Sequence, residues 1–268
     1  MKLDLYQIDS FTDKIFGGNP ACVVPLESWL PDDLLFKIAK ENAVAETAFF
    51  IPLTDSNSEV ASFDLRWFTP EIEMDLCGHA TLATAHVLKR FLSHTENSIS
   101  FQSKSGILEV SVANDMYTLN FPSRMPVEAE LPGIIKTSLS IQPKEVFKSR
   151  DYVLVYASEE EITGIQINRQ ILDQINLDPG GVVITAPGND CDFVSRYFTP
   201  QASIFEDPVT GSSHCSLIPF WSKRLNRKQM TALQLSDRVG KLYCEDKDER
   251  VLIAGNARTY SVGTIWID

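Results

Sequence analysis

One glutamate in the sequence stands among apolar residues, where a carboxylate is suited to moving a proton. Glu46 lies in the segment 43–51 (AVAETAFFI), which carries no other charge. A carboxylate that loses its hydration becomes more basic and can act as a general base near neutral pH. The pattern also fits a strand residue that points outward between inward-facing neighbours. Both interpretations of Glu46 stay open at this point.

Two glycine turns, each at the expected start of a helix, could bind an anion. They are Cys77-Gly78-His79 and Gly211-Ser212-Ser213. Backbone N–H groups at a helix start are unpaired and carry the positive end of the helix dipole, which favours a carboxylate. In the simpler interpretation, both glycines only form tight turns and one of the serines caps the second helix.

Three further side chains near these turns could take part in proton transfer. His79 could donate to a substrate oxygen or relay a proton, and Asp207 could cap the next turn, hold an amine or share a proton with Glu46. The thiolate of Cys77 would be an alternative base at a helix start. A two-thiol racemase needs a second cysteine at the matching place, where the sequence has Val209-Thr210-Gly211.

Length, charge and cysteine content narrow the class of protein. The 268 residues fit one large domain or two modest ones, and 36 acidic against 24 basic side chains give a net charge of −12. This charge opposes binding to nucleic acid and to anionic membranes. Asp4 and Asp9 stand where a signal peptide needs an apolar segment, which predicts a cytoplasmic protein. Five cysteines without a CxxC pair indicate neither a disulfide framework nor a zinc ribbon.

Short strand-like segments predominate and helices are few, which predicts the α+β class. The segments 107–112 and 116–121 flank Asn114-Asp115 and predict a β-hairpin. One helix is expected from Pro31 onward. The clearest helix is expected over 80–92, where Ala, Leu and Thr are frequent.

An internal repeat predicts that these elements form two similar domains. The segment 63–70 (FDLRWFTP) returns as 193–200 (FVSRYFTP), and each copy is followed by an acidic segment, a glycine turn and helix-forming residues. Duplicated halves favour two domains related by a pseudo-twofold axis, with a substrate cleft between them. Prolines between positions 122 and 132 place the boundary, which gives domains of residues 1–124 and 125–268.

The motifs of both halves, in their order along the chain, resemble the PhzF-like (phenazine biosynthesis) family of the diaminopimelate-epimerase-like superfamily. The resemblance spans nearly the whole chain. Its segments are Gly18-Asn19-Pro20-Ala21, Glu46-Thr47-Ala48-Phe49, Arg66-Trp67-Phe68-Thr69-Pro70, Leu76-Cys77-Gly78-His79-Ala80-Thr81, Arg196-Tyr197-Phe198 and Glu206-Asp207-Pro208-Val209-Thr210-Gly211-Ser212-Ser213-His214.

The resemblance implies two mostly antiparallel, barrel-like sheets, each wrapped around a central helix. The last C-terminal strand is then a candidate to complete the first barrel. The resemblance also implies catalysis without a cofactor or a metal, often in homodimers. Matching the motifs residue by residue gives a catalytic role to Glu46, His79 and Asp207, and a substrate-binding role to Asn19, Gly78, Gly211 and Ser212.

From these features we expect a cofactor-independent isomerase that moves a proton within a small carboxylated metabolite by glutamate acid–base catalysis. Two alternatives stay open: an epimerase or racemase that depends on Cys77, and a non-catalytic protein that binds a small molecule. The missing second thiol argues against a two-base racemase. The sequence does not indicate which metabolite is the substrate.

Overall fold

The computed structural model describes residues 1–53, 62–177 and 180–268, and the chain divides into two compact units. The first unit comprises Met1–Asn120 together with Ala254–Asp268, and the second comprises Phe121–Ile253. The division into domains of residues 1–124 and 125–268 stays a prediction. Among the described residues, no helix is both long and apolar enough to cross a membrane.

In its described residues, the first unit is a mixed sheet with two helices. Its strands lie in the order β18–β1–β2–β3–β4–β6–β7–β8, with β5 beside the end of β4. All pairs are antiparallel except β2–β3 and β4–β6. The strands are β1 (Lys2–Ser10), β2 (Asn19–Pro25), β3 (Glu46–Leu53), β4 (Ser62–Phe68), β5 (Glu73–Met74), β6 (Ser98–Ser103), β7 (Gly106–Ala113), β8 (Met116–Pro122) and β18 (Ala257–Trp266).

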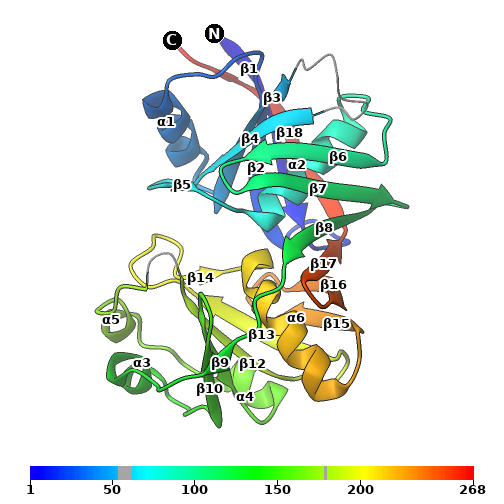
Figure 1. Cartoon of the computed structure of the whole chain (residues 1–268). Helices are drawn as coiled ribbons and strands as arrows, with labels where there is room; N and C mark the ends of the chain where they lie inside the picture. The colour runs from blue at the N-terminus through cyan, green and yellow to red at the C-terminus, as the bar shows by residue number, and fades with distance from the viewer. Residues whose placement is uncertain (54–61, 178–179) are drawn as a thin grey trace. The chain divides into compact units, whose positions relative to one another are not determined.

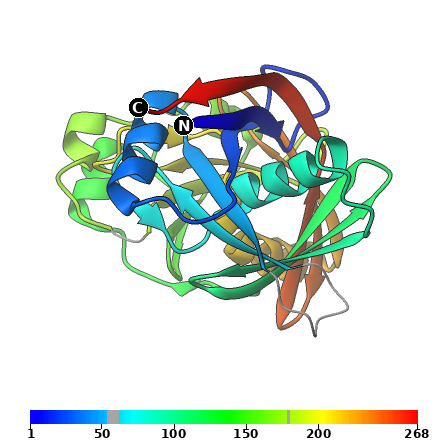
Figure 2. The same cartoon turned by 90° about the horizontal axis from the view of Figure 1, so that it is seen from above.

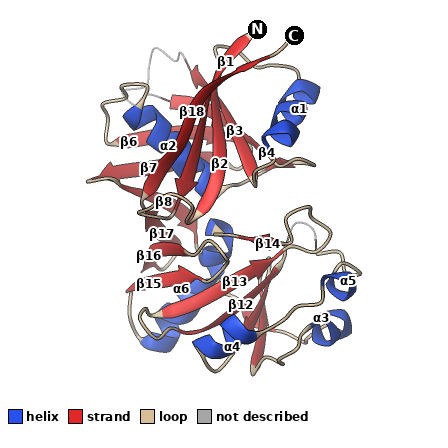
Figure 3. Ribbon diagram, turned by 180° about the vertical axis from the view of Figure 1, so that it is seen from behind, coloured by secondary structure: helices blue, strands red, loops and turns tan. Residues whose placement is uncertain are grey.

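The helices of the first unit differ in how far they are buried. Helix α1 (Asp32–Asn42) buries only one face, through Leu35, Ile38 and Ala39. Helix α2 (Gly78–Arg90) is buried from its first residue to Leu88 and packs against β1, β2, β3 and β18. The sheet curves around it (Figures 1 and 3). Small residues on every side of α2 allow strands to approach it all round, so the expected central helix is confirmed.

The second unit repeats this plan. Its strands lie in the order β9–β10–β11–β12–β13–β15–β16, with β14 beside the end of β13, and only β11–β12 and β13–β15 are parallel. The elements are β9 (Val127–Glu128), α3 (Gly133–Ser138), β10 (Glu145–Lys148), β11 (Tyr152–Val155), α4 (Glu159–Gly164), α5 (Arg169–Leu172), β12 (Val182–Pro187), β13 (Phe193–Phe198), β14 (Glu206–Asp207), α6 (Gly211–Leu225), β15 (Gln229–Gln234), β16 (Gly240–Lys247) and β17 (Arg250–Gly255).

The two units therefore have matching topologies, with β1–β7 and α2 corresponding to β10–β16 and α6. In the first unit, β4 pairs with the two-residue strand β5 at one end and with the parallel strand β6 at the other. In the second unit, β13 pairs in the same way with β14 and β15. Helix α6 is buried over most of its length, as α2 is. The α+β class and the pattern of two similar halves are thus as expected from the sequence.

The repeated sequence segment has a structural reason. Arg66 in β4 donates to both carboxylate oxygens of Glu73 at 2.7 and 3.0 Å, and Arg196 in β13 does the same to Glu206 at 2.7 and 2.8 Å. Each guanidinium also lies over the ring of the phenylalanine two residues later, at 5.0 and 5.1 Å. The repeat thus fixes the turn that leads to each central helix.

Strands from distant parts of the chain complete the first unit. Strand β18 pairs along the whole of β1, from Lys2 opposite Trp266 to Ser10 opposite Ala257. The two ends of the chain consequently lie side by side (Figure 2), and the Met1 ammonium group donates to the carbonyl of Ile267. In the second unit, the corresponding place beside β10 is taken by the short strand β9.

Candidate functional site

In the first unit, the start of one strand and the start of the central helix bring a carboxylate and an imidazole together. Glu46 is the first residue of β3, and His79 is the second residue of α2. Glu46 Oε2 lies 3.1 Å from His79 Nε2, and the two side chains are 14 % and 4 % exposed, respectively. Glu46 is therefore neither an outward-facing surface residue nor fully enclosed.

The other nitrogen of His79 is also surrounded by polar atoms. Asn19 Nδ2 lies 3.2 Å from His79 Nδ1, and Cys77 Sγ lies 3.6 Å from the same nitrogen. The Ser10 hydroxyl donates to the His79 carbonyl at 2.8 Å and ties β1 to the helix start. Because a carboxamide offers both a donor and an acceptor, Asn19 can serve the neutral and the charged ring.

Burial and charge act in opposite directions on this cluster. Burial disfavours an imidazolium, but the Cys77 sulfur and the Glu46 carboxylate outweigh it and raise the pKa of His79 well above its ordinary value. Burial and then the Glu46 carboxylate raise the pKa of the Cys77 thiol. The Glu46 carboxylate thus favours the protonated forms of both the His79 ring and the Cys77 thiol.

The same three side chains are of the types that bind metal ions. In the part of the chain that the structure describes, ligand atoms of Glu46, Cys77 and His79 lie within 4.8 Å of one another. They supply three ligands, as many as the protein gives in catalytic zinc sites and one fewer than in structural sites, and a bound ion would replace the contact between Glu46 and His79. The expectation of metal-free catalysis stays a prediction.

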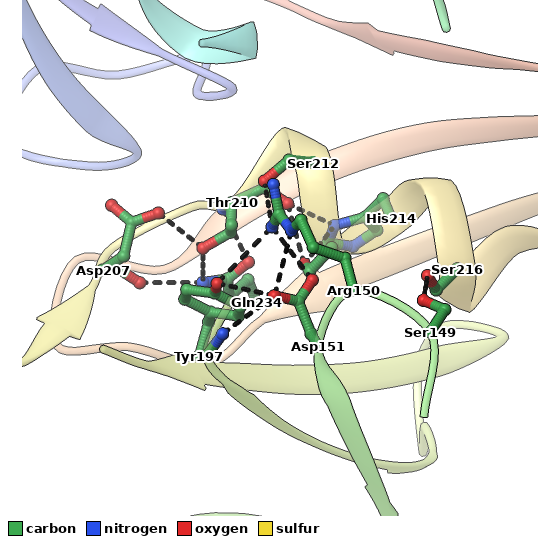
Figure 4. A network of polar contacts seen from close by, with 12 residues as sticks. Ser149, Arg150, Asp151, Tyr197, Asp207, Thr210, Ser212, His214, Ser216 and Gln234 are labelled. Carbon is green, nitrogen blue, oxygen red and sulfur yellow. Dashed lines mark hydrogen bonds and ion pairs between the residues drawn. The ribbon is translucent and has the colours of Figure 1, made fainter. Parts of the chain in front are cut away.

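In the second unit, the start of the central helix faces an arginine. Ser212 is the second residue of α6, and Arg150 Nη2 donates to its Oγ at 2.8 Å. Arg150 also donates through Nε and Nη2 to the two oxygens of Asp151, at 3.1 and 2.9 Å. Figure 4 shows these side chains gathered beside the first turn of α6 together with Tyr197.

Asp207 belongs to the same segment but has different neighbours. The hydroxyl of Thr210 donates to Asp207 Oδ2, and the side-chain amide of Gln234 donates to the Asp207 carbonyl at 2.8 Å. Gln234 Oε1 in turn accepts from the Thr210 backbone N–H at 2.8 Å. These bonds fix the turn between β14 and α6 (Figure 4).

The structure corrects the expected helix starts. Each helix begins at the glycine of its turn and not after it, because α2 and α6 begin at Gly78 and Gly211, and the residues that precede them are Cys77 and Thr210. Neither of these N-cap residues makes a side-chain capping bond. The alternative in which a serine caps the second helix is therefore wrong, and the Ser212 hydroxyl oxygen accepts from Arg150 instead.

The structure brings Asn19, Glu46, Gly78 and His79 together in the first unit, and Asp207, Gly211 and Ser212 onto one short segment of the second. Sequence reasoning missed Arg150, Asp151 and Tyr197. Arg150 and Asp151 are adjacent in the chain, which is typical of an exposed loop. The available signal was Tyr197, because it places a hydroxyl where the first copy of the repeat has Trp67.

The strand registers show which residues correspond in the two units. Thr47 pairs with Phe68 in the first unit, and Val182 pairs with Phe198 in the second, so Thr47 corresponds to Val182. The residues directly before them, Glu46 and Gly181, therefore correspond as well. Both central helices begin with a glycine, which aligns their first turns. The residues of the second unit that correspond to Glu46, Cys77 and His79 are therefore Gly181, Thr210 and Ser212.

Comparison with known proteins places the chain in a family. The family model described as phenazine biosynthesis-like protein matches residues 8–263. The chain belongs to this family. An uncharacterized isomerase of Pseudomonas aeruginosa is 41 % identical over 265 residues, with 99 % of each chain covered. A crystal structure of a PhzF family phenazine biosynthesis protein from Enterococcus faecalis matches with a TM-score of 0.92 and 42 % identity over the full length of both chains.

The fold is shared more widely than the family. A hydroxyproline epimerase from Agrobacterium vitis matches with a TM-score of 0.62 at 10 % identity, covering 98 % of this chain and 92 % of that one, which shows a common fold alone. Within the family, relatives that are 40–42 % identical over nearly the whole chain are named isomerases. The chain is an enzyme of this class.

Proposed function

We propose that the enzyme is a cofactor-independent isomerase in which Glu46 removes a proton from an acidic carbon of a small carboxylated molecule and returns it elsewhere on the same face. Side chains of the first unit carry out the proton transfer. In the second unit, Ser212 and the Gly211 backbone N–H are the groups suited to binding a carboxylate. The observation that carries the proposal is the 3.1 Å contact between Glu46 Oε2 and the buried ring of His79.

This contact would give Glu46 the orientation that a base needs. Oε2 is buried and faces the His79 ring, so the 14 % of the side chain that remains exposed belongs to its other atoms. The imidazolium holds one oxygen and leaves the rest of the carboxylate available. A positioned general base contributes about 10²–10⁴-fold to a rate, and fixed geometry and charge stabilisation supply the remainder.

The differences between the units support one base rather than two. The second unit has Gly181 in place of Glu46 and Thr210 in place of Cys77, so neither a second glutamate nor a second thiol stands at a corresponding position. The raised pKa of Cys77 leaves its thiol protonated at neutral pH, which makes it a weak base. Transfer of a proton by one group on one face is the chemistry that such an arrangement supports.

The remaining expected residues receive supporting roles in this proposal. Asn19 holds the ring of His79, and the Gly78 N–H lies at the positive end of α2. Asp207 orients the segment before α6 through its bond from Thr210. The homodimer implied by the resemblance and the cytoplasmic location predicted from Asp4 and Asp9 stay predictions.

The experiment is proton exchange in D2O, followed by NMR, on a panel of small carboxylic acids with acidic C–H bonds. We expect the wild type to incorporate deuterium into one class of acid and to isomerise it. Glu46→Gln should reduce both rates by at least 10²-fold. Glu71→Gln, which removes an exposed carboxylate of the same unit, is the matched control and should act like the wild type. A Glu46→Gln variant that exchanges at the wild-type rate would overturn the proposal.

A further inference from the structure

We propose that Arg150 is a positioning residue that sets the Ser212 hydroxyl as a hydrogen-bond donor toward a carboxylate of the ligand. This inference rests on the proposed function in one respect, because it takes the ligand to be a small carboxylated molecule. Beyond that function, it assigns a role to a residue that the sequence motifs did not indicate, and it gives a physical reason why the second unit would prefer a carboxylate to an uncharged ligand.

Asp151 fixes the position of the arginine. Its side chain is 1 % exposed, and its oxygens accept from Arg150 Nε and Nη2, from the Tyr197 hydroxyl at 2.9 Å and from the Gly181 backbone N–H at 2.9 Å. A buried carboxylate with this many donors has its charge satisfied and cannot move without breaking several bonds. The guanidinium attached to it is therefore held in one orientation (Figure 4).

The guanidinium determines the direction of the Ser212 hydroxyl. A guanidinium can only donate, so the 2.8 Å bond from Arg150 Nη2 makes Ser212 Oγ an acceptor. The hydroxyl hydrogen of Ser212 is then left for a different acceptor. In the described part of the chain no acceptor for it is recorded, whereas the hydroxyl of the next residue, Ser213, donates to the Thr210 carbonyl at 2.9 Å. Ser212 is partly exposed and Ser213 is buried.

The residues at the same place in the two central helices face groups of opposite charge. In the first unit, the second residue of the central helix is His79, which faces the Glu46 carboxylate. In the second unit, the corresponding residue is Ser212, which faces the Arg150 guanidinium. The duplicated fold therefore places a carboxylate, paired with His79, at this helix position in one half, and a guanidinium, paired with Asp151, in the other.

The test uses benzoate as a minimal rigid carboxylate and benzamide as its uncharged analogue, with binding measured by NMR titration. We expect the wild type to bind benzoate at least tenfold more tightly than benzamide. Arg150→Lys keeps the charge beside Asp151 but lacks the fork that serves Asp151 and Ser212 together. It should lower the benzoate affinity several-fold, by no more than Ser212→Ala does, and leave the benzamide affinity unchanged.

A serine pair supplies the matched control. Ser212→Ala should weaken benzoate binding several-fold, whereas Ser213→Ala should not, because the Ser213 hydroxyl is already used within the helix. In the double variant Arg150→Lys/Ser212→Ala the losses should not add, because the arginine acts through the serine. Melting temperatures of all variants check that each one folds.

Several results would overturn the inference: a wild type that binds benzoate no better than benzamide, an Arg150→Lys variant with wild-type preference, or fully additive losses. These results are separate from the test of the proposed function. If Glu46→Gln keeps full deuterium exchange while Arg150→Lys loses the preference for benzoate, the proposed base is wrong and the role of Arg150 stands. The reverse pattern would reject Arg150 alone.

Discussion

Gly181 occupies the position in the second unit that Glu46 occupies in the first, and the structure shows why no side chain can stand there. A Cβ built on Gly181 would lie 2.6 Å from Cζ and from the hydroxyl oxygen of Tyr197, and 2.7 Å from the carbonyl oxygen of Phe198. That carbonyl belongs to the neighbouring strand β13, and Tyr197 is held by its bond to Asp151. Even the single methyl group of Gly181→Ala therefore has to displace the backbone or the ring.

Two costs add in the Gly181→Ala variant. Overpacking a buried position destabilises by about 1–3 kcal/mol. Moving the Tyr197 ring also weakens its hydrogen bond to the charged Asp151, which costs about 1.5–3 kcal/mol if the bond is lost. Together we expect a loss of about 3–5 kcal/mol, and at roughly 2–4 °C per kcal/mol for a unit of this size the melting temperature should fall by about 6–20 °C.

Thermal unfolding followed by far-UV circular dichroism, together with urea unfolding, measures this loss. The control is Gly133→Ala, since a Cβ at Gly133 would meet no atom within 4 Å. The control should stay within about 0.5 kcal/mol of the wild type. If Gly181→Ala melts together with the control, the close approach of Tyr197 does not constrain this position, and the physical reason offered for the difference between the units is wrong.

Three further outcomes are expected. First, burial lowers the pKa of His214 to about 4, so the neutral ring stabilises the folded state above the ordinary pKa, and this stability should disappear as the pH falls from about 6.5 to 4. In urea titrations across this window, the unfolding free energy of the wild type should fall by about 3 kcal/mol more than that of His214→Gln. Parallel curves for the two proteins would contradict this expectation. Second, the pKa of His79 is raised despite burial, because of the Cys77 sulfur and the Glu46 carboxylate. The contribution of His79 to the stability of the folded state is therefore present below the ordinary pKa and is lost as the pH rises through the raised value. The difference in unfolding free energy between wild type and His79→Gln should be smaller at pH 9 than at pH 6, and a difference that grows with pH would reject the ion pair. Third, Arg196→Lys should cost about 1–3 kcal/mol in urea unfolding, because lysine cannot make the paired bonds to Glu206, and an unchanged midpoint would show that the pair is not structural.

Local sequence patterns predicted the elements well where one physical rule dominates. The hairpin is formed by β7 and β8, and its turn residues Asn114 and Asp115 both have positive φ angles, 51° and 63°, as the tight turn requires. The central helix of the first unit was expected over 80–92 and runs over Gly78–Arg90, because glycine weakens the apparent helix signal at a start that has no side-chain cap.

The candidate site was less accessible to sequence reasoning. The apolar surroundings of Glu46 indicated a shielded carboxylate, but its neighbour His79 follows 33 residues later and meets it only through the packing of α2 against β3. Arg150 and Asp151 gave no signal, because burial of an adjacent charged pair depends on donors from Tyr197 and Gly181, and these approach only when the sheet forms. The repeated arginine pairs with Glu73 in the first unit and with Glu206 in the second, at the turn before each central helix.

The pairing of β18 with β1 has a consequence for the order in which the protein assembles during synthesis. Residues 257–266, which supply the edge partner of β1, emerge from the ribosome only after the whole of the second unit. Until then β1 has an unpaired edge, and such an edge is a known template for aggregation. The second unit does not need these residues to complete its fold. Free chains truncated after residue 256 should accordingly be digested by protease in the first unit and resist digestion in the second.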